Sequence, residues 1–142
     1  MIFIGCGRLK RKGRCKARDL YTGVYFRTCL AFARSLEEDD RIFVLSAKYG
    51  VVALDQMVES YDLKLSDLSR EELLKWKRRV LQFVRREAEK GFSIEFVCGR
   101  VYSDGLPGKN LLPKVGIGKQ MRFMRQQMKP RGLLDVPRDS TF

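Results

Sequence analysis

The stretch RIFVLSAKYGVVALDQMVESYDLKL, from Arg41 to Leu65, decides the fold. Residues 42–45 form a continuous apolar run, which is typical of a strand buried on both faces of a parallel sheet. Ligands in open α/β sheets bind in the crevice at the carboxyl ends of the strands, so we expect a binding site directly after this run. The residues of this stretch expected at the site are Ser46, Lys48, Tyr49, Gly50, Tyr61 and Asp62.

Two further apolar runs, at 1–5 and 93–98, predict strands of the same sheet, and each is followed by glycine and arginine. A fourth run at 111–115 contains Pro113, which favours an edge strand. We therefore predict an α/β fold: a three-layer sandwich with a mostly parallel sheet of about four strands flanked by helices. The carboxyl ends of three strands are expected to converge.

Helical spacing of apolar residues predicts a helix over 19–36, and 52–68 is expected to be a long loop with a short helix. Ser69 and Glu72 form a capping box, which predicts a helix that ends near Gly91. Its buried side is expected to carry Leu73, Trp76, Val80, Phe83 or Val84, and Ala88. A basic final helix is predicted over 116–128, with packing through Ile117, Met121, Phe123, Met124 and Met128.

A chain of 142 residues with 44% hydrophobic content fits one domain, which we place at 1–128, with an extended tail over 129–142. No apolar run reaches about 18 residues, and the apolar start lacks a basic leader. These features predict a cytoplasmic protein with no membrane partner. The sequence leaves the oligomeric state open.

The charge points to a polyanionic partner, because 29 lysines and arginines face 17 acidic residues, a net charge of +12. Nucleic acid is the first candidate, and DNA is favoured over RNA. The alternatives are a basic surface that only aids solubility, an acidic protein partner, or a disordered basic loop at 5–16 that contacts nothing. The expected phosphate-binding residues are Lys10, Arg11, Lys12, Lys119, Arg122 and Arg125.

The four cysteines include no CxxC pair, and the chain has no histidine, so neither a metal nor a cofactor is predicted. Cys29 and Cys98 are expected to be small core residues. Cys6 ends the first strand between two glycines, where backbone geometry explains it better than nucleophilic catalysis, because no histidine base could activate it.

The segment from Leu45 to Leu65 resembles the central motif of the YaaA peroxide-stress protein family and of a related family of bacterial and phage domains. GCGRLKRK, ARDLYTGVYF, CGRVYSDGL and GIGKQMRFM agree in order, so the resemblance reaches about residue 128. It implies DNA binding, with a role in DNA-damage protection or phage biology, and places Arg18, Asp19 and Tyr21 at the site rim. The chain departs from the family pattern at Arg8, where lysine is usual, and at Ala53, where proline is frequent.

The expected edge of the sheet suits a nucleotide or an extruded base, because tyrosines stack, cations bind phosphate, and Asp or Ser contacts polar base edges. The predicted substrate-binding residues are Cys6, Gly7, Arg8, Arg18, Tyr21, Ser46, Tyr49, Gly50, Tyr61, Gly99, Arg100 and Tyr102.

A remote similarity to the uracil-DNA-glycosylase-like module of archaeosine synthases implies an alternative, a DNA or nucleoside N-glycosylase. Such a reaction needs one carboxylate to orient water, and without histidine the candidates are Asp62, then Asp19, with Lys48 as leaving-group donor. Asp62 could equally be a turn or cap residue. A second alternative is a non-enzymatic basic protein that binds an acidic protein partner.

Overall fold

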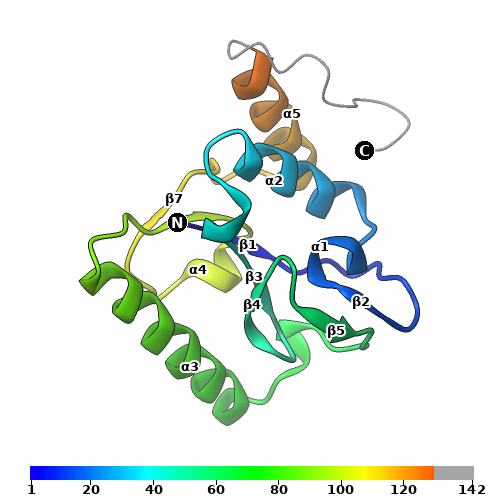
Figure 1. The fold of residues 1–142 in the computed structure, drawn as a ribbon, viewed down its shortest axis with the longest axis vertical. Coiled ribbons are helices and arrows are strands. Elements are labelled where there is room, and N and C mark those ends of the chain that lie inside the picture. Colours follow the sequence, from blue (N-terminus) through cyan, green and yellow to red (C-terminus); the bar gives the residue numbers. More distant parts are fainter. Residues whose placement is uncertain (130–142) are drawn as a thin grey trace.

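The computed structural model describes residues 1–129, which form a mixed α/β fold around a five-stranded sheet. The strand order is β4-β3-β1-β6-β7, and every pairing is parallel except that of β3 with β4 (Figure 1). A separate antiparallel pair joins β2 and β5. The strands are β1 (Ile2–Gly5), β2 (Arg14–Lys16), β3 (Ile42–Ser46), β4 (Gly50–Ala53), β5 (Met57–Glu59), β6 (Glu95–Val97) and β7 (Lys109–Asn110).

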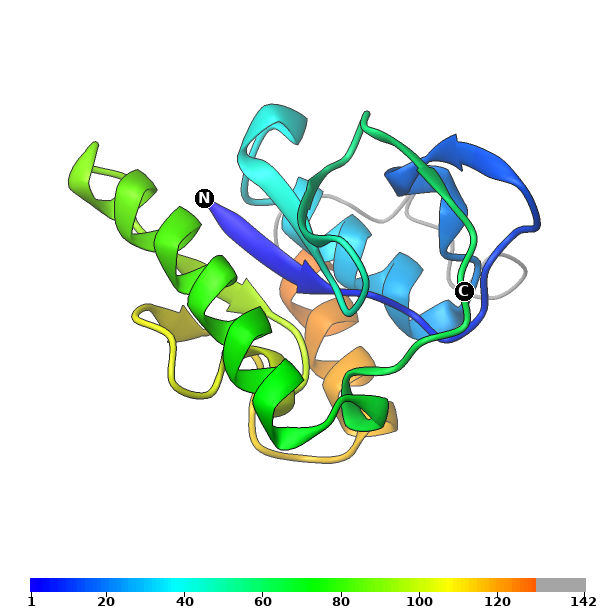
Figure 2. The same ribbon diagram turned by 90° about the horizontal axis from the view of Figure 1, so that it is seen from below.

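The helices lie on both faces of the sheet, with α3 on one face and α2 with α5 on the other (Figure 2). The helices are α1 (Ala17–Leu20), α2 (Val24–Arg34), α3 (Arg70–Glu89), α4 (Arg100–Ser103) and α5 (Ile117–Met128), with short 3₁₀ turns at Asp39–Arg41 and Leu65–Asp67. None of the helices within 1–129 has the length and apolar character needed to cross a membrane.

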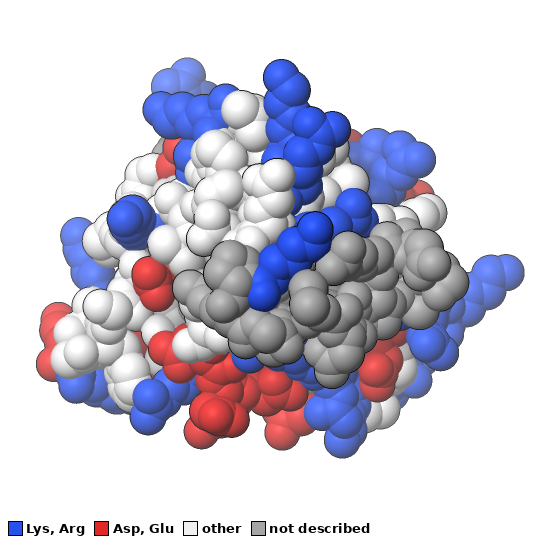
Figure 3. Space-filling model, turned by 90° about the horizontal axis from the view of Figure 1, so that it is seen from above, with Lys and Arg blue, Asp and Glu red and all other residues white. Residues whose placement is uncertain are grey.

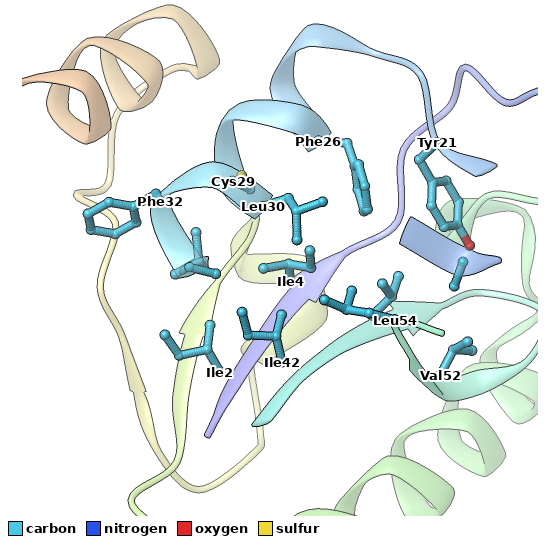
Figure 4. Packing of buried hydrophobic residues seen from close by; sticks show 14 of the residues in the cluster. Ile2, Ile4, Tyr21, Phe26, Cys29, Leu30, Phe32, Ile42, Val52 and Leu54 are labelled. Carbon is cyan, nitrogen blue, oxygen red and sulfur yellow. The ribbon is translucent and has the colours of Figure 1, made fainter. Parts of the chain in front are cut away.

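The side chains of β1 contribute to two separate halves of the core, because successive side chains of a strand point to opposite faces of the sheet. Ile2 and Ile4 pack with α2 and α5, together with Phe26 and Leu30, as Figure 4 shows. Phe3 packs on the other face in the cluster that contains the buried residues of α3. Both faces of β1 are thus covered, as the continuous apolar run predicted.

The central strand β1 is also where the order of the sheet reverses. The chain passes from β1 through α2 to β3 on one side, and later through α3 to β6 on the other. In open α/β sheets a crevice forms where consecutive connections diverge in this way. The fold therefore places a crevice between the carboxyl ends of β1 and β6.

The predicted α/β class and the mostly parallel sheet are confirmed, but the sheet has five strands. The segment 52–68, expected to be a loop, contains the end of β4 and all of β5, and the expected helix over 19–36 is two helices separated at 21–23. The edge strand expected at 111–115 lies at 109–110 instead. The tail predicted from 129 onward lies outside the described residues from position 130.

Most expected core positions are buried, including Cys29, Cys98 and Trp76. Two expected core positions are exposed, and a polar residue one or three positions away in the same helix is buried in each case. Ala88 is exposed and Glu87 is buried in its place, with its carboxylate 3.1 Å from Lys90 Nζ. On α5, Ile117 is exposed while Gln120 is buried, because the first turn of this helix borders a pocket rather than the core.

Candidate functional site

A pocket of about 1040 Å³ lies at the carboxyl ends of β1 and β6, where the order of the sheet reverses. Its walls come from the segment after β1, the amino ends of α2, α4 and α5, and the turn at 63–66. We call it the β1–β6 pocket. Its volume is at the upper end of the range of small-molecule sites in proteins.

The charge of the pocket is of one sign. Five cationic residues line it, and no aspartate or glutamate of the described chain does. The first turns of α2 and α5 also lack acidic residues, and their glycine N-caps provide no side-chain acceptor. Backbone N–H groups at helix amino ends add partial positive charge, so the pocket favours an anion. The cations are Arg8, Lys10, Lys64, Arg100 and Lys114.

The pocket is apolar as well as cationic. Eight large apolar side chains are exposed in residues 1–129, and five of them line this pocket. Exposed apolar groups that gather at one place mark binding surfaces, whereas scattered ones are normal. The ligand that fits therefore has both an anionic and an apolar part. The five residues are Leu9, Val24, Val101, Val115 and Ile117.

The floor of the pocket is formed by Cys6 and Tyr102, whose Sγ and Oη atoms lie 3.3 Å apart. The Tyr102 ring approaches the end of β1 so closely that a Cβ at Gly5 would lie 3.0 Å from its Cε2 atom. Burial raises the pKa of Tyr102 well above its usual value, so the hydroxyl stays protonated and can donate a hydrogen bond.

Two hydrogen-bonded links fix the walls. The Arg100 guanidinium donates from Nη2 to the Leu112 carbonyl at 2.7 Å, while its Nε is buried and has no hydrogen-bond partner within the described chain. The Tyr25 hydroxyl donates to Gln120 Oε1 at 2.6 Å, and Gln120 Nε2 donates to the Pro113 carbonyl at 3.1 Å. The amino ends of α2 and α5 are thereby held together beside the pocket.

The structure brings together seven of the site residues predicted from the sequence. All seven follow β1 or β6. Those that line the pocket are Cys6, Gly7, Arg8, Lys10, Gly99, Arg100 and Tyr102.

The residues that follow β3 lie elsewhere, because this strand turns at once into antiparallel β4. Ser46 is fully buried, and its Oγ donates to the Tyr61 hydroxyl at 2.8 Å. The Tyr61 hydroxyl also lies 2.8 Å from that of Tyr21, and Lys10 Nζ lies 4.4 Å from the Tyr61 ring centroid. Burial raises the pKa of both tyrosines, so the three hydroxyl groups are neutral. They join the β3–β4 hairpin to the segment beside the pocket.

The predicted catalytic residues do not line the pocket. Asp62 is exposed and makes no hydrogen bond or ion pair with another described residue. Asp19 is exposed beside Arg18, with a carboxylate oxygen 3.9 Å from the guanidinium Nε. Lys48 is exposed in the β3–β4 turn, 5.3 Å from the centroid of the Tyr49 ring, and Gly50 begins β4. Their predicted roles at the site stay predictions.

The predicted phosphate-binding residues fall into two groups. Arg11 and Lys12 are exposed between β1 and β2, in a basic segment that is more ordered than expected, because Lys10 bridges to Tyr21 and β2 pairs with β5. The second group lies on α5: Lys119 and Arg122 are exposed and Arg125 is half-buried. Arg122 and Arg125 border a small hollow of about 300 Å³.

Sequence reasoning missed the contributions of α2, α5 and the 63–66 turn to the pocket. The available signals were glycines placed before two amphipathic helices without an acidic first turn, at Gly23 and Gly116. No local pattern shows that both helices begin at the same end of the sheet. The missed residues include Leu9, Val24, Tyr25, Lys64, Lys114, Val115, Ile117 and Gln120.

The acidic residues are concentrated away from the pocket. The exposed run at 38–40 lies directly before β3, at the amino end of the sheet, whereas the pocket lies at the carboxyl ends. Figure 3 shows the largest group of acidic side chains at the lower edge of the view, with smaller groups elsewhere and lysine and arginine distributed around that face. Residues 1–129 contain no group of three or more cysteine, aspartate or glutamate residues placed to hold a metal ion.

The comparisons with known proteins give one match. No curated protein and no solved structure matches the chain. The model of a family of unknown function, DUF6884, matches residues 1–126, which is most of the chain. The chain therefore belongs to the DUF6884 family.

Proposed function

We propose that the protein binds nucleic acid, and DNA rather than RNA, by taking a nucleotide into the β1–β6 pocket. The observation that carries this proposal is the combination of five cations, no carboxylate of the described chain and an exposed apolar lining. Lysine and arginine form charge-assisted hydrogen bonds with phosphate, and apolar and aromatic side chains cover base faces. The resemblance to the YaaA family supports the choice of DNA.

The proposal stops at binding and does not extend to N-glycosidic hydrolysis. Such hydrolysis needs a carboxylate near the reacting carbon, and in residues 1–129 no acidic side chain lines the pocket. The proposal includes a cytoplasmic location, which four free cysteines support. It also includes the three-layer sandwich class, which the packing of α3 opposite α2 and α5 supports.

The test is a fluorescence-anisotropy titration of labelled single-stranded DNA and RNA oligonucleotides at two salt concentrations. The double variant Arg8→Gln/Lys114→Gln removes two exposed cations of the pocket. We expect it to weaken DNA binding roughly tenfold or more, because each lost charge-assisted contact costs about 1.5 kcal/mol or more. The matched control is Arg27→Gln/Lys109→Gln, which removes two exposed cations without ion pairs among the described residues and changes the net charge equally, but lies outside the pocket.

Equal weakening by both double variants would reject the pocket as the binding site. Competition separates DNA from an acidic protein partner: unlabelled DNA should displace the probe, whereas polyglutamate of the same charge should not. Displacement by polyglutamate as effective as that by DNA would reject the nucleotide proposal. An oligonucleotide with an abasic site should bind more weakly than its intact counterpart, because it cannot fill the apolar part of the pocket.

A further inference from the structure

A second basic surface lies on α3 and shares no residue with the β1–β6 pocket. We call it the arginine face and define it by Arg78, Arg79, Arg85 and Arg86. All four residues are exposed, and they border an open hollow of about 660 Å³ together with Leu81, Gln82 and Glu89.

The charge of the arginine face is uncompensated within the described part of the chain. Among the described residues, none of the four arginines has a carboxylate oxygen within ion-pair distance, and two neighbouring acids on the helix have other partners. Glu71 pairs with Lys75, and Glu87 pairs with Lys90. Glu89 is the one acidic residue that borders the hollow. Four unpaired guanidinium groups therefore face solvent on one helix.

The spacing of the arginines follows the geometry of the helix. Arg78 and Arg85 are seven residues apart, as are Arg79 and Arg86. The two members of each pair therefore lie on the same side of α3, about 10 Å apart along its axis. Arg79 also lies against the β3–β4 hairpin, since a Cβ at Gly50 would be 3.5 Å from its Nε. Part of the surface is thus held in place before any partner binds.

The composition of the surface selects the kind of partner. Arginine forms bidentate contacts with phosphate, and the separation of about 10 Å within each pair is close to the width of the major groove of B-form DNA, about 12 Å. Single-stranded nucleic acid is bound with the help of stacking aromatic rings, and no aromatic residue of the range 1–129 borders this hollow. An anionic membrane surface also attracts basic clusters, so vesicles serve as a competitor in the test; among the described residues, Leu81 is the apolar side chain that borders the hollow, and it is half-buried.

We propose that the arginine face binds the phosphate backbone of duplex nucleic acid, independently of sequence and of the β1–β6 pocket. Because α3 and α5 lie on opposite faces of the sheet, one molecule then carries two separate nucleic-acid surfaces (Figure 2). This inference goes beyond the proposed function, since the pocket could fail to bind a nucleotide while the arginine face still binds a duplex.

The test compares binding of a short blunt-ended DNA duplex across a salt series by anisotropy. Arg78→Gln/Arg85→Gln should weaken duplex binding at least tenfold and reduce the slope of log affinity against log salt by about 2, one for each lost phosphate contact. Arg78→Lys/Arg85→Lys keeps the charge and should retain most of the slope. The control Arg27→Gln/Lys109→Gln removes two exposed cations outside both surfaces and should leave the duplex affinity unchanged.

Single-stranded DNA separates this inference from the proposed function. The arginine-face variant should bind a single strand as the wild type does, while Arg8→Gln/Lys114→Gln should lose single-strand binding and keep duplex binding. An unchanged duplex affinity and salt slope in Arg78→Gln/Arg85→Gln would overturn the inference. It would also be overturned if polyglutamate, or vesicles containing anionic phospholipid, displaced the duplex from the wild type as effectively as unlabelled duplex does.

Discussion

Trp76, the one tryptophan of the chain, connects the core to the floor of the pocket. Its indole Nε1 donates to the Ser46 carbonyl at 2.8 Å, which ties α3 to the end of β3. Its ring also meets that of Tyr102 at an oblique angle, with the centroids 6.3 Å apart. A residue with an apolar body and one polar hydrogen is suited to a buried junction of this kind.

Trp76→Phe should destabilise the protein by about 2 to 3 kcal/mol, because it shrinks a fully packed side chain and leaves the buried Ser46 carbonyl without its donor. Urea unfolding followed by circular dichroism measures the free energy of unfolding. Leu74→Ala, an exposed position on the same helix, serves as the control and should change it little. A loss below about 0.5 kcal/mol for Trp76→Phe would contradict the role of this hydrogen bond.

The cysteines should differ in reactivity. Burial raises the pKa of Cys98 to about 12 and that of Cys29 further, whereas Cys6 and Cys15 are half-buried. Since the thiolate is the reactive form, a disulfide reagent at mildly alkaline pH should modify Cys6 and Cys15 first, and all four only after unfolding. Rapid modification of all four thiols in the native protein would contradict the packing.

A bound oligonucleotide should protect Cys6, which lines the pocket.

Among the secondary structure elements, those with local signals were the ones predicted from the sequence. The capping box of Ser69 and Glu72 is formed as expected, with reciprocal hydrogen bonds of 2.8 and 3.1 Å, and Gly91 follows the end of α3. The continuous apolar runs correctly gave β1 and β3. These features depend on neighbouring residues alone, so one sequence is enough to find them.

The elements that were missed depend on pairing between distant or weakly patterned segments. β4 has the sequence GVVA, without alternation of polar and apolar residues, and the one local hairpin signal is Gly50, whose φ of 77° follows the three-residue turn at 47–49. That turn is why Ser46 is buried instead of opening onto the site. The candidate pocket therefore lies at the predicted edge of the sheet, but at two of the three predicted strand ends, since residues after β1 and β6 line it and those directly after β3 do not.

Helix α4 is held by one lysine. Lys77 Nζ donates to the carbonyls of Val101, Tyr102 and Asp104 at 3.0, 2.9 and 2.6 Å. Lys77→Met keeps the stem but removes these contacts, so it should lower the stability by about 1 to 2 kcal/mol and weaken single-strand binding through displaced Arg100. Chemical unfolding and the anisotropy titration measure the two effects. Lys75→Met, an exposed neighbour on α3, should change neither, and normal binding by Lys77→Met would reject the positioning role.

At the scale of the whole molecule, charge and burial are separated. Within residues 1–129 most lysines and arginines are exposed, while the buried polar groups are mostly neutral hydroxyls. Four tyrosines near the pocket, namely Tyr21, Tyr25, Tyr61 and Tyr102, have a pKa raised above the usual 10.0, chiefly because burial disfavours the charged phenolate.

These tyrosines should make the protein sensitive to alkali. A raised pKa in the folded state means that folded protein retains protons that the unfolded chain releases, so the stabilisation is complete below pH 10.0 and is lost as the pH rises above it. Desolvation lowers the pKa of Lys77, which acts in the opposite direction, but one lysine opposes four tyrosines. Urea unfolding across this range should show falling stability, and the tyrosinate absorbance of these four residues should rise only as the protein unfolds. Reversible ionisation of all the tyrosines in folded protein just above pH 10.0 would show that water reaches these hydroxyls and that the cluster beside the pocket is open.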